Sequence, residues 1–580
     1  MGGGAGGGSD GDAPSSFPKD VRPPIVTFSP SLWGDSFASF TLDQQVQEKY
    51  AEAIQVLKEE TRRLLILAKE KYTTPQTLIL IDTLERLGVA YHFKQEIHEN
   101  IQQIFNVNFN STGDSTHDNY DLFTTALQFR LLRQHRHYVP CGVFDKFKNE
   151  KNEFHEEISS DAKGLLSLYE AAHVRIHEEN ILEEAVAFTT HHLNRLLPQL
   201  AKQSTSPLHD LVKRALHQSL HRGVPRIETR NYISIYEKLE SKDEMLLKFA
   251  KLDFNFLQNM YRKELCDLTR WWNKFDLKSK LPYARDRLVE CYLWGQAFHF
   301  EPKYSYVRSA VAKGMQMISI MDDTYDNYAT LEEADILTEA FERWDINEAE
   351  RLSDTMKVVY KFVLSIYEDY ERDAVQEQKS YAVPYAKETV KQVARAYNKE
   401  LKWFMGREMP TFEEYFVNTV FTSCIYVMFA AVIPGMKSAS EETINWLLSE
   451  PKIIIGTAKM GRYVEDLGSH ERENRGGEML TAVDCYMKHH GVSKEEALEK
   501  FVELAEDGWK DVNKEWIKIT SSSCSKDSSN IPKEDMIEQL INYARVAEVT
   551  YKNCADGYTY PEHYLGPQIA AQFLHPLIIS

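Results

Sequence analysis

The sequence predicts an all-α protein, and three observations support that fold class. Alternating runs of Val, Ile and Thr, which are typical of strands, are scarce. Tracts bounded by Gly and Pro are few and short. Long stretches carry apolar residues at spacings of three and four with Glu, Lys, Arg and Gln between them, which is the pattern of amphipathic helices; they include 44–71, 306–320, 355–372 and 385–405.

The chain of 580 residues is long enough for several domains at ~150 residues each. We expect residues 1–21, which begin MGGGAGGGSDGD, to form a disordered Gly-rich tail. Residues 22–235 contain successive amphipathic segments without an ionisable cluster to which chemistry can be assigned. The motifs that indicate chemistry all lie in residues 236–580. The sequence therefore predicts an N-terminal helical domain followed by a catalytic one.

Composition excludes several classes of function. The net charge of −19 argues against binding of nucleic acid, which requires a basic face. The seven cysteines are scattered and form no C-x-x-C pair, so a reducing compartment is expected and a zinc site is not. No apolar stretch is expected to reach the ~20 residues that span a bilayer. Because the N-terminus resembles neither a signal peptide nor a transit peptide, we expect a cytoplasmic location. We also expect the protein to be a monomer.

An acidic motif follows an apolar segment at 315–326, MQMISIMDDTYD. Asp322 and Asp326 are four residues apart and would share one face of a helix, with Asp323 beside them. Carboxylates that converge at the rim of an apolar interior repel one another unless a cation neutralises them. Oxygen ligands favour Mg²⁺ or Ca²⁺, and Mg²⁺ is typically held by one or two carboxylates plus substrate phosphates. From this spacing alone, a solvated acidic helix end is an equally good interpretation.

Two further groups of residues favour the metal interpretation. Glu465, Ser469 and Glu473 are spaced i, i+4 and i+8, so they offer a second helical face with oxygen ligands. Arg285 and Arg287 supply planar, permanently charged groups that fit phosphate oxygens. Carboxylates, a divalent metal and arginines together describe a site for a diphosphate.

Several motifs occur in the order found in one known family. The chain has Arg22-Pro23 before Trp33, an R-x-R at 285–287 followed by LVECYLW at 288–294, the D-D-x-x-D motif, and Asp556-Gly557-Tyr558 after Tyr551. From about residue 22 to 580 the sequence therefore resembles a plant terpene synthase of the sesquiterpene-forming kind.

The resemblance implies a two-domain all-α architecture, with a catalytically silent N-terminal α-barrel and a class I isoprenoid-synthase bundle. It implies that three Mg²⁺ ions bridge the substrate diphosphate to two helical walls, with Mn²⁺ as a substitute. Asp322 and Asp326, supported by Asp323, would hold two ions, and Glu465, Ser469 and Glu473 the third. The resemblance further implies that the diphosphate is contacted by Arg285, Arg287 and Arg462. It implies that the pocket is lined by Trp294, Tyr551 and Tyr558. Its lid would be formed by the segments 276–287 and 552–566, the second of which contains Asp556.

The chain departs from the family pattern at Glu465, where the usual residue is Asn or Asp. One extra methylene moves the carboxylate by about 1.5 Å, and Mg²⁺ demands near-ideal octahedral geometry. Three explanations remain open: the backbone adjusts, Asp466 or a water takes the place of the ligand, or the site accepts a more tolerant metal such as Mn²⁺.

The predicted reaction is the ionisation of farnesyl diphosphate, followed by rearrangement of the allylic cation in a dry pocket to C15 products. The break of a pocket helix is expected at Thr422-Ser423-Cys424. A monoterpene synthase acting on geranyl diphosphate is the nearest alternative. A chain-elongating prenyltransferase is a weaker alternative, because it normally has two full aspartate-rich motifs and the second motif here contains Glu465, Ser469 and Glu473 instead. A non-enzymatic helical scaffold is also weaker, because it would not explain why the carboxylates share helical faces.

Overall fold

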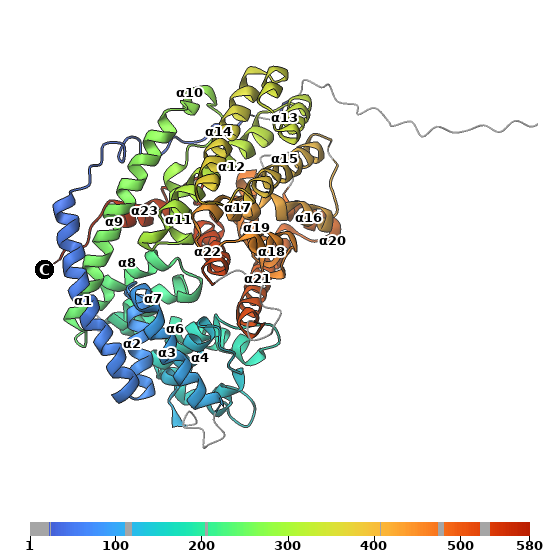
Figure 1. Ribbon diagram of the computed structural model, residues 1–580. Helices are drawn as coiled ribbons and strands as arrows, with labels where there is room; N and C mark the ends of the chain where they lie inside the picture. Colours follow the sequence, from blue (N-terminus) through green and yellow to red (C-terminus); the bar gives the residue numbers. More distant parts are fainter. Residues whose placement is uncertain are drawn as a thin grey trace, which may run out of the picture.

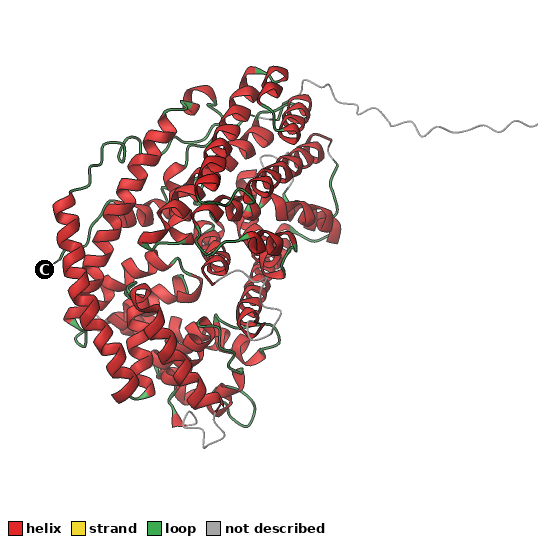
Figure 2. Ribbon diagram, viewed as in Figure 1, coloured by secondary structure: helices red, strands yellow, loops and turns green. Residues whose placement is uncertain are grey.

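The computed structural model describes residues 22–23, 25–110, 119–202, 207–406, 408–473, 481–522 and 534–579. Within these ranges it contains helices, one isolated bridge between Lys148 and Phe154, and no β-strand (Figure 2). The all-α prediction is therefore confirmed. The tail predicted for residues 1–21 lies outside the described residues.

The N-terminal helical unit consists of α1 to α8 with their connecting loops (Figure 1). Polar residues start its helices: the Asp43 carboxylate accepts hydrogen bonds from the backbone of Gln45 and Val46, and Thr73 forms a capping box with Gln76. The helices of the unit are α1 (Gln44–Lys71), α2 (Thr74–Arg86), α3 (Lys94–Phe105), α4 (Leu122–Gln134), α5 (Ala162–Ala172), α6 (Asn180–Lys202), α7 (Pro207–His217) and α8 (Pro225–Tyr236).

A single long helix, α9 (Glu244–Asn273), joins this unit to the rest of the chain. Its first half packs in the N-terminal core through residues such as Leu247 and Phe254, and its second half packs in the C-terminal core through Leu257 and Trp272. The hydrophobic cores thus divide within α9, whereas the predicted domain boundary at 235/236 stays a prediction.

The C-terminal helices surround the segment that carries the acidic motif. Three predicted amphipathic stretches of this region, 306–320, 355–372 and 385–405, are confirmed as parts of longer helices. The helices after α9 are α10 (Leu277–Lys280), α11 (Leu288–Phe298), α12 (Ser305–Asn327), α13 (Leu331–Arg343), α14 (Asp354–Gln376), α15 (Ala382–Gly406), α16 (Phe412–Thr422), α17 (Ile425–Val432), α18 (Glu441–Leu448), α19 (Lys452–Glu473), α20 (Ala482–His490), α21 (Lys494–Ser522), α22 (Glu534–Thr550) and α23 (Leu565–Phe573).

The expected break at Thr422-Ser423-Cys424 separates α16 from α17. Cys424 has a φ of 59°, in the left-handed region that a non-glycine residue rarely adopts. The Ser423 hydroxyl donates to the Val420 carbonyl oxygen at 2.7 Å, and the Tyr543 hydroxyl donates to the Ser423 carbonyl oxygen at 3.0 Å. Side-chain hydrogen bonds to the backbone thus hold the chain in two short helices.

The same segment corrects one expectation from the sequence. Phe412–Gly435 is long and apolar enough to cross a membrane by length and composition, although no such stretch was expected. Most of it is buried, and α17 packs against α12 and α15 while α16 packs against α15 and α19. Its hydrophobicity is accounted for by packing in the protein core, and the break at Cys424 interrupts it.

The N-terminal segment before α1 crosses the C-terminal helices. Arg22 Nη1 donates to the Tyr328 carbonyl oxygen at 2.8 Å, and its guanidinium also pairs with Glu333 at 3.1 Å. Trp33 Nε1 donates to Glu290 Oε1 at 2.8 Å in the interior. The Arg-Pro and Trp motif therefore attaches the start of the described chain to α11 and α13.

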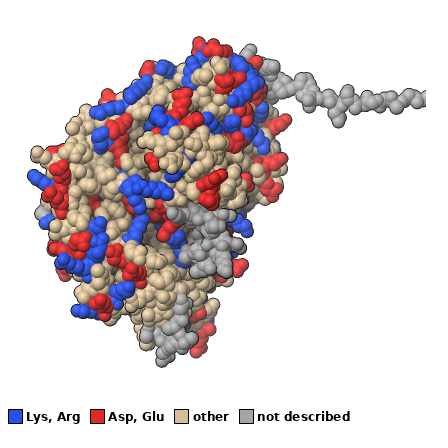
Figure 3. Space-filling view, in the orientation of Figure 1, with Lys and Arg blue, Asp and Glu red and all other residues tan. Residues whose placement is uncertain are grey.

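Surface charge is mixed on the face shown in Figure 3. Acidic and basic side chains are interspersed there, so the net charge of −19 is not gathered into one patch of this face. Long-range steering of a charged ligand by a surface patch is thus not a feature of this face.

Candidate metal site

A polar pocket lies between α12, α15, α16 and α19, with a cavity volume of about 70 Å³. It unites residues of both predicted helical walls with Arg285 of the first arginine motif. Six of the predicted site residues line it: Arg285, Asp322, Asp326, Arg462, Glu465 and Glu473. The structure thus brings together groups that are up to 188 positions apart (473 − 285) in the chain.

The first wall is the C-terminal end of α12. Asp322 faces the pocket with 29% of its side chain exposed, whereas Asp323 is fully buried. Arg285 joins the two: its Nη2 lies 2.6 Å from Asp322 Oδ2, and its backbone N–H donates to Asp323 Oδ2 at 2.7 Å. Asp323 therefore positions Arg285, in keeping with the supporting role expected of it.

Asp326 is the group on this wall that most needs a cation. Removal from bulk water raises its pKa well above the ordinary aspartate value, and the neighbouring charges of Asp322 and Glu400 raise it further. An ionised carboxylate in these surroundings is unfavourable until positive charge arrives. This is the electrostatic condition of a site that takes up a divalent ion.

The second wall is α19, where Glu465 and Asp466 have opposite surroundings. Glu465 lines the pocket with 31% of its side chain exposed, and its Oε2 lies 2.8 Å from Arg462 Nη1. Asp466 is fully buried, accepts a 2.7 Å hydrogen bond from Arg462 Nη2, and does not line the pocket. Burial raises the pKa of Asp466 to about 8. Of the two acids, Glu465 is the one in reach of a ligand in the pocket.

Ser469, the middle member of the second motif, is 1% exposed and is not part of the pocket lining. Its hydroxyl oxygen is buried without a hydrogen-bond partner in the structure. Buried polar atoms are rarely left unpaired, and an unpaired one calls for a specific cause such as an ion. One turn from Glu465 and one from Glu473, this oxygen is the third hard-oxygen donor that the second motif predicts on α19.

The predicted metal ligands fit Mg²⁺ by atom type, because all of them are carboxylate or hydroxyl oxygens. Within the described part of the chain, no three His, Cys, Asp or Glu side chains form a ready-made metal-binding cluster. Instead, the pocket carboxylates are paired with arginines, Asp322 with Arg285 and Glu465 with Arg462. Metal binding would therefore require these ion pairs to open, which releases both guanidinium groups for an anionic ligand.

Two charged residues of the pocket lining, Glu400 and Arg472, were not predicted. Glu400 on α15 accepts hydrogen bonds from Asn418 Nδ2 at 2.9 Å and Thr422 Oγ1 at 3.1 Å, and burial raises its pKa to about 7. A single glutamate in an amphipathic helix has no spacing that marks it. Arg472 directly precedes Glu473 in the second motif, and this adjacency is the one sequence feature that could have indicated a role for Arg472.

Arg472 links the second wall to the predicted lid. Its Nη2 lies 2.8 Å from Glu473 Oε1, and its Nε donates to Asp556 Oδ2 at 2.8 Å. The Asp556 carboxylate also accepts from the Thr559 backbone N–H at 2.8 Å, which fixes the loop around it. Asp556 therefore holds the 552–566 segment against α19 beside a predicted metal ligand.

Arg287 is placed differently from the prediction. It is 1% exposed and does not line the pocket. Its guanidinium donates to the carbonyl oxygens of Ser29, Tyr558 and Thr559 at 3.0, 3.1 and 2.9 Å. In this structure Arg287 fastens the N-terminal segment to the predicted lid, so its contact with a diphosphate stays a prediction that this geometry does not support.

The predicted aromatic residues lie outside the polar pocket. The Trp294 ring packs edge-on against Tyr543 with centroids 5.6 Å apart, and its Nε1 is buried without a partner. The Tyr558 hydroxyl lies 3.3 Å from Cys291 Sγ and also bonds the Ser319 hydroxyl. The Tyr551 ring packs so closely on Gly468 that a Cβ there would be 2.9 Å from it. Their roles toward a bound cation remain predictions.

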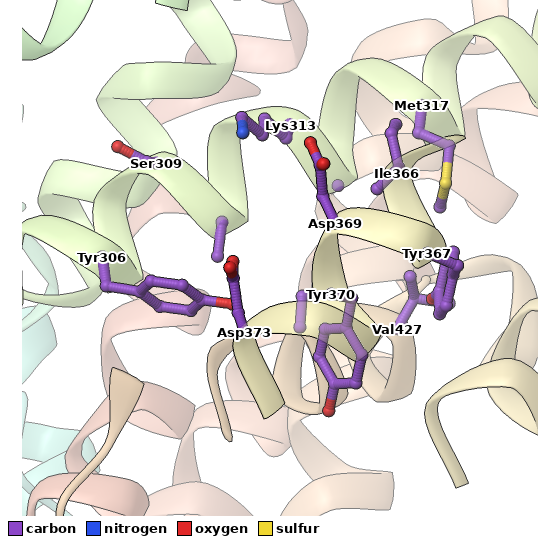
Figure 4. A pocket seen from close by; sticks show the side chains of 13 residues that line it. Tyr306, Ser309, Lys313, Met317, Ile366, Tyr367, Asp369, Tyr370, Asp373 and Val427 are labelled. Carbon is purple, nitrogen blue, oxygen red and sulfur yellow. The ribbon is translucent and has the colours of Figure 1, made fainter. Parts of the chain in front are cut away.

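A second pocket, of about 170 Å³, opens between α12, α14 and α17 (Figure 4). Tyr306 and Lys313 from α12 and Asp369 and Asp373 from α14 stand at its polar side, and Met317 is among its apolar residues. None of the predicted site residues lines it. Different faces of α12 therefore line the two pockets, and Asp322 and Asp326 of the acidic motif line the 70 Å³ pocket and not the 170 Å³ one.

Comparison with known proteins matches two family models to the chain. Residues 32–216 match the model described as terpene synthase, N-terminal domain, and residues 273–511 match that described as terpene synthase family, metal binding domain. The second match contains both carboxylate walls of the pocket.

Full-length relatives and a solved structure agree with these matches. The chain is 51% identical to a gamma-cadinene synthase of Ocimum basilicum over 97% of its own length and 99% of that protein. It is 50% identical to a tau-cadinol synthase of Lavandula angustifolia, with 96% and 98% covered. Its fold matches grey poplar isoprene synthase, solved with three Mg²⁺ ions and dimethylallyl-S-thiolodiphosphate, at a TM-score of 0.82 and 32% identity, covering 91% of this chain and 97% of that one.

Proposed function

This chain belongs to the terpene synthase family, and from that membership and the pocket geometry we infer that it is a class I sesquiterpene synthase. Its named relatives form sesquiterpenes, and they match it at about half identity over nearly the whole chain. The observation that carries the inference is the pocket in which Asp322 and Asp326 of α12 meet Glu465 and Glu473 of α19.

The residues of the pocket have separate tasks in the proposed reaction. Asp322, Asp326, Glu465 and Glu473 of the pocket lining would hold the metal, together with Ser469 from the same face of α19. We propose that the metal is Mg²⁺, in three ions, with Mn²⁺ as a substitute. Bound metal would supply Lewis-acid stabilisation of the departing diphosphate. Arg285 and Arg462, freed from their carboxylates, would bind phosphate oxygens with their planar guanidinium groups.

The hydrocarbon part of the substrate needs space beyond this pocket. A cavity of about 70 Å³ is much smaller than the ~300 Å³ or more of a typical small-molecule pocket. The surrounding segments must therefore move to admit a C15 chain, and close again to exclude water from the cation. Hydrogen bonds from Arg285 and Arg287 to Tyr558 and Thr559 join the two predicted lid segments in this structure, and we propose that they break when the substrate enters.

We propose farnesyl diphosphate as the substrate and the cytoplasm as the location. The named relatives support the fifteen-carbon substrate. The cysteines of the described residues, none of them in a disulfide, support a reducing compartment. A monomeric state belongs to the same proposal.

The test is incubation of the purified protein with Mg²⁺ and either farnesyl or geranyl diphosphate, followed by gas chromatography of the extracts and measurement of released diphosphate. We expect C15 products at a kcat/KM at least tenfold above that for C10 products. A higher kcat/KM for geranyl diphosphate would identify a monoterpene synthase instead. Absence of diphosphate release with both substrates would remove the enzymatic proposal.

Substitutions at 465 and 466 test which acid binds metal. Glu465→Gln is expected to raise the Mg²⁺ concentration for half-maximal activity by tenfold or more, a change that ~1.4 kcal/mol produces. Glu465→Asp should retain substantial activity, since the pocket keeps a carboxylate. Asp466→Asn should leave the Mg²⁺ requirement nearly unchanged, because Asp466 is buried against Arg462 outside the pocket. If the Asp466 variant shows the larger shift in Mg²⁺ requirement, Asp466 and not Glu465 holds the ion.

A further inference from the structure

The helix α21 lies between the N-terminal helical unit and the second metal wall (Figure 1). One of its faces packs along α19, and another is hydrogen-bonded to the N-terminal unit. It is therefore the element through which the N-terminal unit reaches the helix that carries Glu465, Ser469 and Glu473.

The strongest contact on the N-terminal side is made by Glu506. Arg222 binds its carboxylate in a two-pronged manner, Nη1 to Oε1 at 2.5 Å and Nη2 to Oε2 at 2.7 Å. Arg175 Nη2 adds a third bond at 2.7 Å. The arginine side chains are only 5–6% exposed, while Glu506 is 36% exposed. Paired guanidinium–carboxylate bonds restrict orientation as well as distance.

Other residues of α21 extend this contact along the same face. Asn513 donates to the carbonyl oxygens of His173 and Arg175 at 3.2 and 2.9 Å. Trp516 Nε1 donates to the Gln134 carbonyl oxygen at 3.1 Å. At about 100° per residue, positions 506, 513 and 516 fall within about 80° of one another. The N-terminal unit therefore fixes both the rotation and the axial position of α21.

The opposite contact, between α21 and α19, is tight. A Cβ at Gly508 would lie 2.9 Å from the Met460 Cβ, so only glycine permits this separation of the helices. A Cβ at Gly456 of α19 would lie 3.6 Å from the Asp511 Cβ, in ordinary contact. Close-packed helices tend to move together, because a tightly packed interface absorbs little movement of one helix alone.

We infer that the N-terminal helical unit positions the second metal wall, through the Arg175–Glu506–Arg222 cluster and α21. The inference rests on the proposed function, because it assigns a task to residues of a metal-binding wall. Glu506 is a positioning residue in this scheme, since it does not line the polar pocket. The helices that contain no predicted chemistry thereby set the geometry at Glu465 and Glu473.

The test compares Glu506→Gln with a matched control, Glu96→Gln. Glu96 is also bound by an arginine, Arg62, and its side chain is 22% exposed, but both partners lie in α1 and α3, away from α21. The first readout needs no turnover: it is the Mg²⁺ concentration that gives half of the maximal rise in melting temperature in the presence of inorganic diphosphate. The second readout is the Mg²⁺ dependence of diphosphate release from farnesyl diphosphate.

For Glu506→Gln we expect the half-saturating Mg²⁺ concentration to rise at least threefold in both readouts, with an unchanged circular dichroism spectrum. Glu96→Gln should lower the melting temperature without changing the Mg²⁺ requirement. If Glu506→Gln does not fold, Glu506→Asp, which keeps the charge and shortens the side chain, should show the same shift. An unchanged Mg²⁺ requirement in the folded variant overturns the inference. A wild-type protein that binds Mg²⁺ and diphosphate without turnover contradicts the proposed function instead.

Discussion

Replacing Asp326 by Asn is expected to abolish diphosphate release and, at the same time, to raise the melting temperature of the metal-free protein. The carboxylate pKa is raised well above its ordinary value by burial and by the charges of Asp322 and Glu400. A folded-state pKa above the unfolded one means that ionisation at neutral pH opposes folding. The amide cannot ionise, so the variant escapes this cost and also loses the metal ligand.

The expected loss of activity is about 10³-fold or more, corresponding to ~4 kcal/mol of lost transition-state stabilisation. Asp322→Asn should lose activity similarly. Diphosphate release measures the first effect, and thermal unfolding in a chelator at pH 7 measures the second. Asp369→Asn, on the α14 side of the second pocket, is the control and should leave turnover unchanged. Undiminished turnover in the Asp326 variant would exclude Asp326 as a metal ligand.

Replacing Arg287 by Gln is expected to lower kcat/KM by about 100-fold and to expose the N-terminal segment to proteases. The wild-type guanidinium is the shared donor for the carbonyl oxygens of Ser29, Tyr558 and Thr559. The carbonyl oxygens of Tyr558 and Thr559 accept these bonds in the interior, and a buried carbonyl left without a partner costs about 1–3 kcal/mol. The N-terminal segment and the lid should therefore separate, and water should enter the pocket.

Limited proteolysis near residues 25–40 and the ratio of alcohol to hydrocarbon products measure these effects for Arg287→Gln. We expect faster cleavage and a larger alcohol fraction, because water that enters can trap the cation. Arg395→Gln removes an exposed arginine that pairs with Glu342 and Glu388 on the surface, and it should change neither quantity. If Arg287→Gln weakens the binding of inorganic diphosphate while the N-terminal segment stays protected, Arg287 contacts the diphosphate as the sequence predicted.

Helical periodicity explains which parts of the site could be predicted. Asp322 and Asp326 on one helix, and Glu465 and Glu473 on another, share faces by spacing alone, and all four line one pocket. Arg285 and Arg287 lie in the non-helical segment before α11, where no period fixes direction. The Arg285 side chain lines the pocket, whereas the Arg287 guanidinium donates to backbone carbonyl oxygens outside it.

Other features depended on tertiary packing. Glu400 reaches the pocket because α15 crosses it at that turn, and a lone glutamate gives no sign of this in the sequence. The apolar stretch Phe412–Gly435 reflects burial between neighbouring helices, a property that hydrophobicity alone does not distinguish from burial in lipid. The contact of Glu506 with Arg175 and Arg222 joins residues more than 280 positions apart and follows from no local pattern.

The break after α16 has an electrostatic consequence. A helix C-terminus carries a partial negative charge of roughly half an elementary unit, from carbonyl groups that have no partner in the helix. Thr422, the last residue of α16, lines the pocket, so this helix end lies in the protein interior beside the metal site. A left-handed residue such as Cys424 costs on the order of 1–2 kcal/mol. The macrodipole of α16 directs its negative pole toward the pocket, where it favours positive charge, and its backbone carbonyl oxygens are weaker nucleophiles than a carboxylate.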